Sequence, residues 1–279
     1  MTCREALLHL QSLLIAKSNS RQEAEDILSL VIGCNRSDLY LQGDRELESS
    51  LFETALQYAE RRIAGEPLAY IHGRVEFYGC HITVNSSVLI PRPETEVLVD
   101  HIVQVLKKDR TEGKVLLDLC CGSGCIGIAL KKKFPSLIVL LSDVSAEALK
   151  IASKNATINQ ADVEFLCGDL LAPLAGRKVD YCVCNPPYVT EAEYEVLDVE
   201  VKEFEPRLAL VGGKDGLEFY RRLASGLGGC LSRSGKAWLE IGYTQGNELE
   251  KLFTFPPWKK TCLKNDWAGH HRFFFLENE

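Results

Sequence analysis

The sequence predicts an α/β fold in which a small bundle of helices precedes a parallel sheet. From residue 114 onward, short apolar runs alternate with helical patterns, which is typical of a parallel sheet covered by helices on both faces. The first 65 residues carry apolar residues at helical spacing and no strand pattern. Between the two, alternating β-forming residues predict a hairpin linker. We therefore expect an N-terminal helical domain over 1–65, a β-hairpin linker over 66–92 and the sheet domain over 93–279.

Composition narrows the class of protein. The chain has 279 residues, of which 46% are hydrophobic and 25% charged, as is usual for a globular protein. The net charge is −7, whereas nucleic-acid binders usually carry a basic patch. No apolar run approaches the roughly 20 residues of a membrane helix, and the N-terminus lacks a signal-peptide pattern. We expect a cytoplasmic, monomeric protein that binds neither membrane nor nucleic acid stably.

The 11 cysteines follow no zinc spacing, and several lie inside apolar runs. Reduced, buried thiols are the expected state, with no metal site.

The N-terminal helices can be placed from their apolar stripes and end signals. Leu7–Leu14 carries the first stripe. Ser20–Glu23 reads as a capping box that opens a second helix, which Gly33 ends. A third helix covers 47–63, and a short helical piece is expected near 37–41.

The linker combines a hairpin with proline breaks. Phe77–Val84 alternates around Gly79, which can form the turn. After Pro91 and Pro93, Thr95 or Glu94 is expected to start the next helix. Arg92 and Glu94 either brace that helix or face a ligand, and the sequence leaves both readings open.

The sheet domain reads as strands separated by helices. We expect strands over 115–120, 137–141, 163–166, 179–184, 236–241 and 273–276, and helices up to 133 and over 145–159, 216–228 and 244–253. Lys131–Lys133 fall at a helix C-terminus, where cations complement the helix dipole.

A glycine-rich turn follows the first strand of the sheet. Gly122, Gly124 and Gly127 would let a backbone approach a ligand, although this spacing alone is a weak signal. Asp118 precedes the turn, where a carboxylate would repel a pyrophosphate but suit a cationic amino-acid group.

Two further strand ends carry acidic residues. Asp143 lies where a ribose diol would bind, and Asp169-Leu170 could meet an adenine edge. An adenosine with a positive amino-acid tail is S-adenosylmethionine. Loop or helix capping remains the alternative for Asp118 and Asp143 taken singly.

The tetrapeptide Asn185-Pro186-Pro187-Tyr188 follows another apolar strand. Two prolines fix two φ angles and remove two backbone donors, and Asn185 is kept extended before them. Amide and carbonyl oxygens can then face one way beside the flat ring of Tyr188. Such a set of acceptors suits a planar –NH2 group.

Together, this tetrapeptide and the Asp118–Gly124 turn resemble the amino-methyltransferases with the seven-stranded, Rossmann-like S-adenosylmethionine fold. Longer stretches make the chain similar to the peptide chain release factor N5-glutamine methyltransferases. These stretches are Arg62–Ile71, Phe77–Gly79, Leu89–Glu96, Glu205–Leu210 and Gly213–Leu217.

The resemblance implies the reaction and its residues. The acceptor would be the glutamine of the Gly-Gly-Gln motif in class 1 peptide chain release factors, and S-adenosylhomocysteine the second product. Asn185, Pro186 and Tyr188 would be catalytic, and Asn185–Tyr188 would bind the glutamine. The cofactor would be held by Asp118, Cys120, Cys121, Gly122, Ser123, Gly124, Asp143, Asp169, Leu170 and Asn185.

The sequence departs from the family at three of these positions. Cys120 and Cys121 replace the usual Gly and Thr, and Leu170 stands where some members have Trp. A cysteine at 120 predicts an ordinary φ there.

An acidic segment follows the tetrapeptide. Residues 191–205 carry seven acidic residues and one lysine, either as a solvated loop or as a docking surface for a basic partner. Either way it would repel DNA, which weighs against an adenine-N6 methyltransferase acting on nucleic acid. A binding protein without activity is the other alternative, although the acceptor tetrapeptide is complete.

Overall fold

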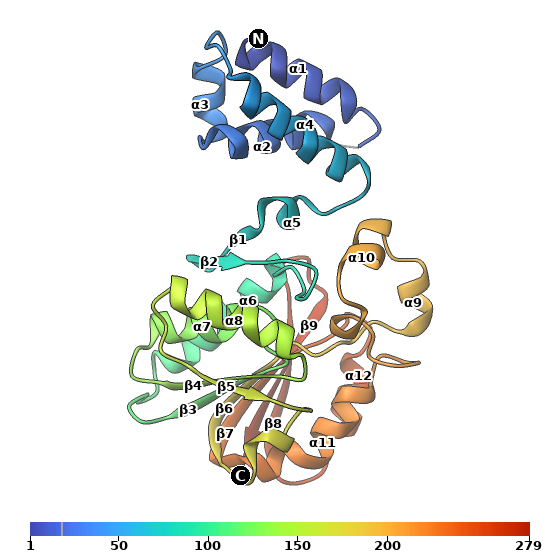
Figure 1. The fold of residues 1–279 in the computed structure, drawn as a ribbon. Coiled ribbons are helices and arrows are strands. Elements are labelled where there is room, and N and C mark those ends of the chain that lie inside the picture. The colour runs from blue at the N-terminus through green and yellow to red at the C-terminus, as the bar shows by residue number, and fades with distance from the viewer. Residues whose placement is uncertain (18) are drawn as a thin grey trace. The chain divides into compact units, whose positions relative to one another are not determined.

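The computed structural model describes residues 1–17 and 19–279, which form two compact units (Figure 1). One unit contains 1–73 together with 199–204, and the other contains 74–198 and 205–279. The units divide at 73/74, so the hairpin belongs with the sheet, whereas the expected boundaries were at 65 and 92. A short segment from the middle of the chain completes the N-terminal unit.

The N-terminal unit is built of helices in its described residues, apart from an isolated antiparallel bridge between Thr2 and Glu46. Its helices are α1 (Cys3–Leu13), α2 (Ser20–Ile32), α3 (Arg36–Leu41), α4 (Ser49–Ile63), α5 (Leu68–His72) and α10 (Val199–Phe204). Apolar stripes at helical spacing bury Leu10, Ile27, Leu28, Ala55 and Ala59 in one core.

The helix ends of this unit only partly follow the sequence signals. Gly33 ends α2 at φ +75°, as expected. The predicted capping box at Ser20–Glu23 is wrong, because Asn19 is the N-cap residue and no side chain caps this end. Glu23 instead pairs with Arg62 of α4. The capping box that does form joins Thr2 and Glu5 on α1.

Arg62 also attaches α10 to this unit. Its guanidinium, 8% exposed, lies 2.9 Å from Glu23 Oε1 and 2.6 Å from Glu200 Oε2 of α10. One buried cation is thus neutralised by two carboxylates, a geometry in which a buried charge can be tolerated.

The hairpin forms as expected from β1 (Arg74–Phe77) and β2 (Cys80–Thr83). Tyr78 and Gly79 make the turn with φ of 47° and 75°. Asn155 fastens the hairpin to the sheet domain, since its side chain accepts the Thr83 N–H at 2.7 Å and donates to the Thr83 carbonyl at 3.0 Å.

The next helix, α6 (Pro93–Leu106), begins at proline with Arg92 as N-cap and no side-chain cap. The helix therefore begins one or two residues before the predicted start at Glu94 or Thr95. Thr95 is buried, and its hydroxyl donates to Glu240.

A seven-stranded sheet forms the second unit, in the order β5-β4-β3-β6-β7-β9-β8. Its strands are β3 (Val115–Leu119), β4 (Ile138–Asp143), β5 (Glu164–Cys167), β6 (Val179–Cys184), β7 (Leu231–Glu240), β8 (Trp258–Asn265) and β9 (His271–Asn278). β3 to β7 run parallel, while β9 is antiparallel to both its neighbours. Every predicted strand is present.

Strand β8 had no prediction because its sequence, WKKTCLKN, is largely polar and lies at the sheet edge. The remaining helices are α7 (Cys125–Lys133), α8 (Ala146–Ile158), α9 (Glu191–Glu195), α11 (Glu218–Cys230) and α12 (Gly246–Leu252). Lys131–Lys133 do lie in the last turn of α7. In the described residues, no helix is long and apolar enough to cross a membrane.

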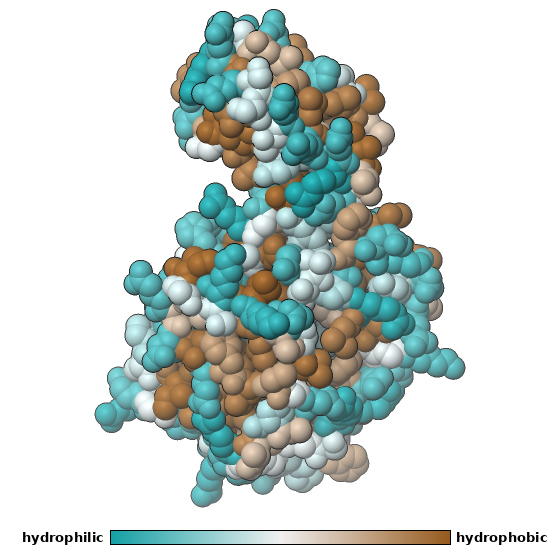
Figure 2. All heavy atoms as spheres, viewed as in Figure 1, coloured by the Kyte–Doolittle hydropathy of each residue, from teal (hydrophilic) through white to brown (hydrophobic). Residues whose placement is uncertain are grey.

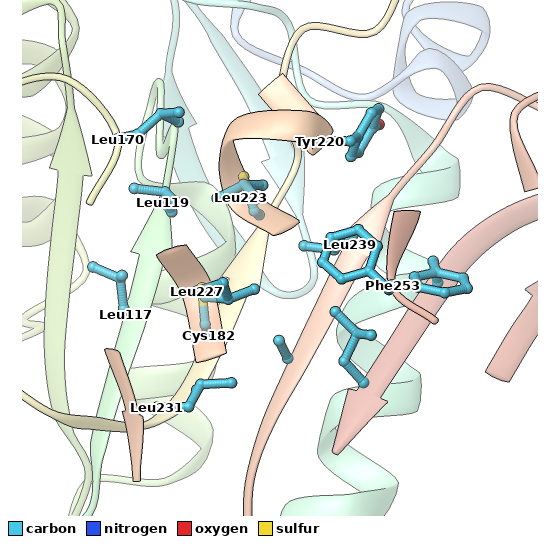
Figure 3. Close-up of a cluster of buried hydrophobic side chains, with 14 of the residues drawn as sticks. Leu117, Leu119, Leu170, Cys182, Tyr220, Leu223, Leu227, Leu231, Leu239 and Phe253 are labelled. Carbon is cyan, nitrogen blue, oxygen red and sulfur yellow. The ribbon is translucent and has the colours of Figure 1, made fainter. Parts of the chain in front are cut away.

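The sheet packs against α11 through a dense apolar core (Figure 3). Leu117, Cys182 and Leu239 from the strands meet Leu223 and Leu227 of the helix. Cys182 thus fills core space like a small hydrophobic residue, as expected. All 11 cysteines are free thiols.

Candidate active site

The order of the strands reverses at β3, because β4 and β5 follow on one side of it and β6 and β7 on the other, all of them parallel. In α/β folds, ligands bind in the crevice outside the carboxyl ends of strands at such a switch point. A cavity lies there, lined among others by Cys120, Cys121, Gly122, Ser123, Asp143, Asp169, Leu170, Asn185 and Pro187. Asp118, Gly124, Pro186 and Tyr188 do not line it.

The turn after β3 is built from left-handed residues. Cys120, Gly122 and Gly124 have φ of 57°, 51° and 76°. The expectation of an ordinary φ at Cys120 is therefore wrong. The chain keeps the turn shape that glycine would adopt without strain, at a cost of about 1–2 kcal/mol for a side chain there. An added Cβ at Gly122 would meet no atom within 4 Å, so this turn leaves open space beside its backbone.

Asp118 lies beneath this turn, with only 1% of its surface exposed. Its Oδ2 accepts the Gly127 N–H at 2.8 Å, and its Oδ1 has no hydrogen-bond partner. Burial raises the Asp118 pKa to about 7, against the lowering effect of the Gly127 hydrogen bond. The structure thus places this carboxylate behind the cavity wall, where it supports the start of α7.

Asp143, at the end of β4, does line the cavity. Its Oδ2 accepts the Gly122 N–H and its Oδ1 the Ser145 N–H, both at 2.9 Å. Burial raises its pKa, while these backbone hydrogen bonds oppose the shift. One carboxylate therefore joins the turn after β3 to the start of α8.

Asp169 and Leu170 complete the wall after β5. Asp169 lies 2.5 Å from Arg222, on a partly exposed surface. Leu170 is buried with φ 45° and packs against the core beneath the sheet.

These residues fit an S-adenosylmethionine molecule by their chemistry. The wall offers carboxylates at Asp143 and Asp169, open backbone at Gly122 and apolar surface at Leu170 and Ile126. Asp118 Oδ1, which has no hydrogen-bond partner, lies behind this wall and not in it. A nucleoside with a cationic tail needs this mixture of acceptors and apolar contact.

The acceptor tetrapeptide leaves β6 directly into the cavity. Asn185 and Pro187 line it, whereas Pro186 and Tyr188 turn elsewhere. The backbone after Asn185 is closely packed from behind, since a Cβ at Gly212 would lie 2.5 Å from the Pro187 carbonyl oxygen. The Tyr188 carbonyl accepts from Gln245 Nε2 at 3.0 Å.

Two buried residues next to the tetrapeptide, Thr95 and Glu240, had no sequence prediction as site residues, and Thr95 also lines the cavity. Thr95 donates its hydroxyl to Glu240 Oε2 at 2.8 Å, and the Tyr188 hydroxyl lies 3.4 Å from Glu240 Oε1. Burial raises the Glu240 pKa to about 7, opposed by the Thr95 hydrogen bond and the nearby Arg272. A glutamate directly after the apolar run Ala237–Leu239 was the available signal.

The cavity is walled on another side by residues from the linker and from the segment after α10. Glu205, 4% exposed, accepts the Ile90 N–H at 3.0 Å and lies 2.5 Å from Arg92. Arg92 therefore does both things that the sequence left open, because it pairs with Glu205 and lines the cavity.

Several members of the acidic segment have partners inside the chain. Glu205 is buried, Glu200 pairs with Arg62, and Glu193 closes a capping box with Thr190 at the start of α9. These three residues hold the fold together, so they do not support the interpretation of this segment as a docking surface for a basic partner.

The seven-stranded, doubly wound sheet and this cavity fit a methyltransferase, and the comparisons show that the chain is one. Residues 94–208 match the methyltransferase small domain, and residues 5–73 match the PrmC N-terminal domain. The crystal structure of a methyltransferase from Pyrococcus furiosus shares the fold with a TM-score of 0.53 and 18% identity, over 79% of this chain and 98% of that one.

Curated relatives give the particular family. The release factor glutamine methyltransferase of Chlamydia trachomatis is 45% identical over 260 residues, covering 93% of this chain and 88% of the relative. The enzyme of the same name from Bacillus cereus is 35% identical over the full length of both chains. The chain belongs to the release factor glutamine methyltransferase family, as its sequence motifs indicated.

Proposed function

We propose that this enzyme transfers a methyl group from S-adenosylmethionine to the side-chain amide nitrogen of glutamine in the Gly-Gly-Gln motif of class 1 release factors. The observation that carries the proposal is the single cavity that joins the turn after β3 to Asn185. The site proposed for the methyl donor and the residue proposed to accept the N–H groups of the substrate therefore lie in the same cavity. The relatives' names support a glutamine in a release factor as the acceptor.

The cofactor would be held by residues of three strand ends. Asp143 is proposed to bind the ribose hydroxyls, the turn over Cys120–Gly124 to pass beside the amino-acid tail, and Asp169-Leu170 to border the adenine. Asp118 acts from beneath the turn. When bound, the cofactor supplies an electrophilic methyl group on a sulfonium centre.

The chain's own contribution is to orient the acceptor. An amide nitrogen is a weak nucleophile because its lone pair is delocalised. We propose that Asn185 Oδ1 and the Pro186 carbonyl accept the two N–H groups, which fixes the nitrogen and favours its pyramidalisation. The Pro186 carbonyl is bonded to the nitrogen of Pro187, which lines the cavity. Orientation of this kind can supply several kcal/mol of a barrier, and fixed dipoles can supply more.

The N-terminal unit is proposed to bind the protein partner. Several of its large apolar side chains are exposed, and Figure 2 shows hydrophobic residues at the visible surface of this unit. These exposed side chains are Leu8, Leu13, Ile15, Tyr40, Leu41 and Ile63. Apolar surface left outside a core often marks an interaction site.

The test is to incubate the protein with labelled S-adenosylmethionine, a release factor and DNA, and to locate the methyl group by mass spectrometry. We expect the label on the glutamine, and none on a release factor whose motif glutamine is replaced by alanine. Label on adenine would support the nucleic-acid alternative. Absence of any label would contradict the enzymatic proposal.

A further inference from the structure

Glu240 is a buried carboxylate that the proposed reaction does not use. It ends β7 with 1% of its surface exposed and lies behind the acceptor tetrapeptide. Its two oxygens face two different hydroxyl groups. Thr95 Oγ1 lies 2.8 Å from Oε2, and Tyr188 Oη lies 3.4 Å from Oε1.

Thr95 also contacts Asn185, the residue proposed to bind the substrate amide. Asn185 Nδ2 lies 3.5 Å from the same Thr95 Oγ1, a long hydrogen bond in this structure. Glu240 of β7, Thr95 of α6 and Asn185, which directly follows β6, are far apart in the sequence. Their side chains thus form one row of contacts.

The chemistry of the row determines its direction. An ionised carboxylate can only accept, so the single hydroxyl hydrogen of Thr95 must point to Glu240. The Thr95 oxygen then offers only lone pairs to Asn185, and only the –NH2 end of a carboxamide can bind a lone pair. The oxygen end of Asn185 is left for the cavity.

We propose that Glu240 and Thr95 are positioning residues that fix the orientation of the Asn185 carboxamide, so that its Oδ1 faces the amide –NH2 group of the substrate glutamine. This inference rests on the proposed function, in which Asn185 Oδ1 accepts an N–H of the substrate. If the carboxamide were flipped, its own –NH2 group would face the –NH2 group of the substrate. Two hydrogen-bond donors cannot pair, so the substrate amide would not be held there.

The charge state of Glu240 is decided by its neighbours on several elements. Arg272 of β9 favours the carboxylate, as do the hydroxyls of Thr95 and Tyr188, while Glu94 of α6 and burial disfavour it. A protonated Glu240 could donate to Thr95 and thereby remove the preference at Asn185. Because its pKa is about 7, the two states exchange near neutral pH.

The same carboxylate also holds the far end of the tetrapeptide through Tyr188. The Tyr188 side chain therefore acts behind the cavity, where burial raises its pKa and its hydroxyl stays a donor. The sequence predicts that Tyr188 binds the glutamine, but Tyr188 does not line the cavity.

The first arm of the experiment uses matched variants in methyl-transfer assays. Thr95→Val removes the hydroxyl at nearly constant volume and should lower kcat by about tenfold or more, with cofactor affinity within about twofold of the wild type. Thr95→Ser keeps a hydroxyl and should recover most of the loss. Thr157→Val makes the same chemical change on the exposed surface of α8 and should leave kcat unchanged.

Glu240→Gln provides the second arm, since it keeps the shape but can offer an N–H to Thr95. We expect a lower kcat and loss of the rise in rate through about pH 7 that Glu240 ionisation gives the wild type. Wild-type kcat and pH profile in Glu240→Gln, or equal kcat in Thr95→Val and wild type, would overturn the inference.

The third arm does not depend on turnover. In ¹⁵N-resolved NMR of the free protein, assigned through Asn185→Asp, the Asn185 side-chain –NH2 signals should move in Thr95→Val and stay in place in Thr95→Ser. Unchanged signals in Thr95→Val refute the positioning role, whatever the acceptor is. Failure of the wild type to methylate glutamine, with these NMR shifts present, instead refutes the proposed function alone.

Discussion

The two halves of the cavity are built by different means. The cofactor half is a turn with φ above zero at Cys120, Gly122 and Gly124, whose Gly122 N–H is held by the Asp143 carboxylate. The acceptor half is a rigid tetrapeptide whose side chains are held by Thr95 and Glu240, more than 50 residues away on either side. Each half also conceals one buried carboxylate with a pKa near 7, Asp118 or Glu240.

This difference teaches where each half is vulnerable. The cofactor half depends on backbone φ angles and on backbone N–H groups. The acceptor half depends on contacts between the side chains of Asn185, Thr95 and Glu240. The following predictions test that contrast from the largest expected effect to the smallest.

Asn185→Ala should lower turnover by about 1,000-fold, because it removes the side-chain oxygen proposed to receive the substrate N–H. Cofactor affinity, measured by calorimetry, should change little, because the turn over Cys120–Gly124 is untouched. Equal losses of affinity and turnover would mean that the two halves are not separable.

Raising the pH should destabilise the protein through its two buried carboxylates. Because the folded pKa of Asp118 is raised from 3.8 to about 7, its contribution to stability is present below the unfolded pKa and lost as pH rises through 7. Between pH 5 and 9, Asp118 alone should cost about 3 kcal/mol of unfolding free energy. Urea unfolding of the wild type and of Asp118→Asn checks this, since the variant should lose correspondingly less over the same range. Parallel pH curves would contradict the assignment.

Asp143→Asn should weaken cofactor binding by about 10- to 100-fold, because charge-assisted hydrogen bonds to Gly122 and Ser145 are replaced by weaker ones. Turnover at saturating cofactor should fall less than affinity. Asp162→Asn, on an exposed loop, is the matched control and should bind as the wild type does. A purely kinetic defect in Asp143→Asn would place this residue in the acceptor half.

Cys120→Gly should stabilise the protein by about 1 kcal/mol, since glycine adopts φ of 57° without the strain of a side chain. Cys121 has an ordinary φ, so Cys121→Gly should destabilise the protein instead. Urea unfolding of both variants measures the difference. The same sign in both variants would show that packing, not backbone strain, decides stability here.

The same contrast explains what the sequence could predict. The turn, Asp143 and Asn185 were found because their signals are local: glycine spacing, the end of an apolar strand and a double proline. Thr95 and Glu240 were missed because their roles arise only when α6 and β7 meet behind β6, which no local pattern encodes. Asp118 was found, but its place behind the cavity wall depends on the fold of α7 over it.

The strand order could be inferred in part from the alternation of strands and helices and from the family resemblance. Edge strand β8 was lost because its alternation of lysines and apolar residues is too weak to stand out. The capping box predicted at Ser20–Glu23 is wrong because Glu23 pairs instead with Arg62, a residue distant in sequence.

The membership of α10 in the N-terminal unit has a consequence for how this protein can be taken apart. A cut at the 73/74 junction does not release that unit, because 199–204 remains joined to the sheet domain at both ends. A fragment ending at residue 73 would also leave the Arg62 guanidinium without Glu200, and Gly65 without the neighbouring Phe204 ring. The unit is therefore not a module that a single recombination event could exchange. Any chimera must bring its own version of both segments.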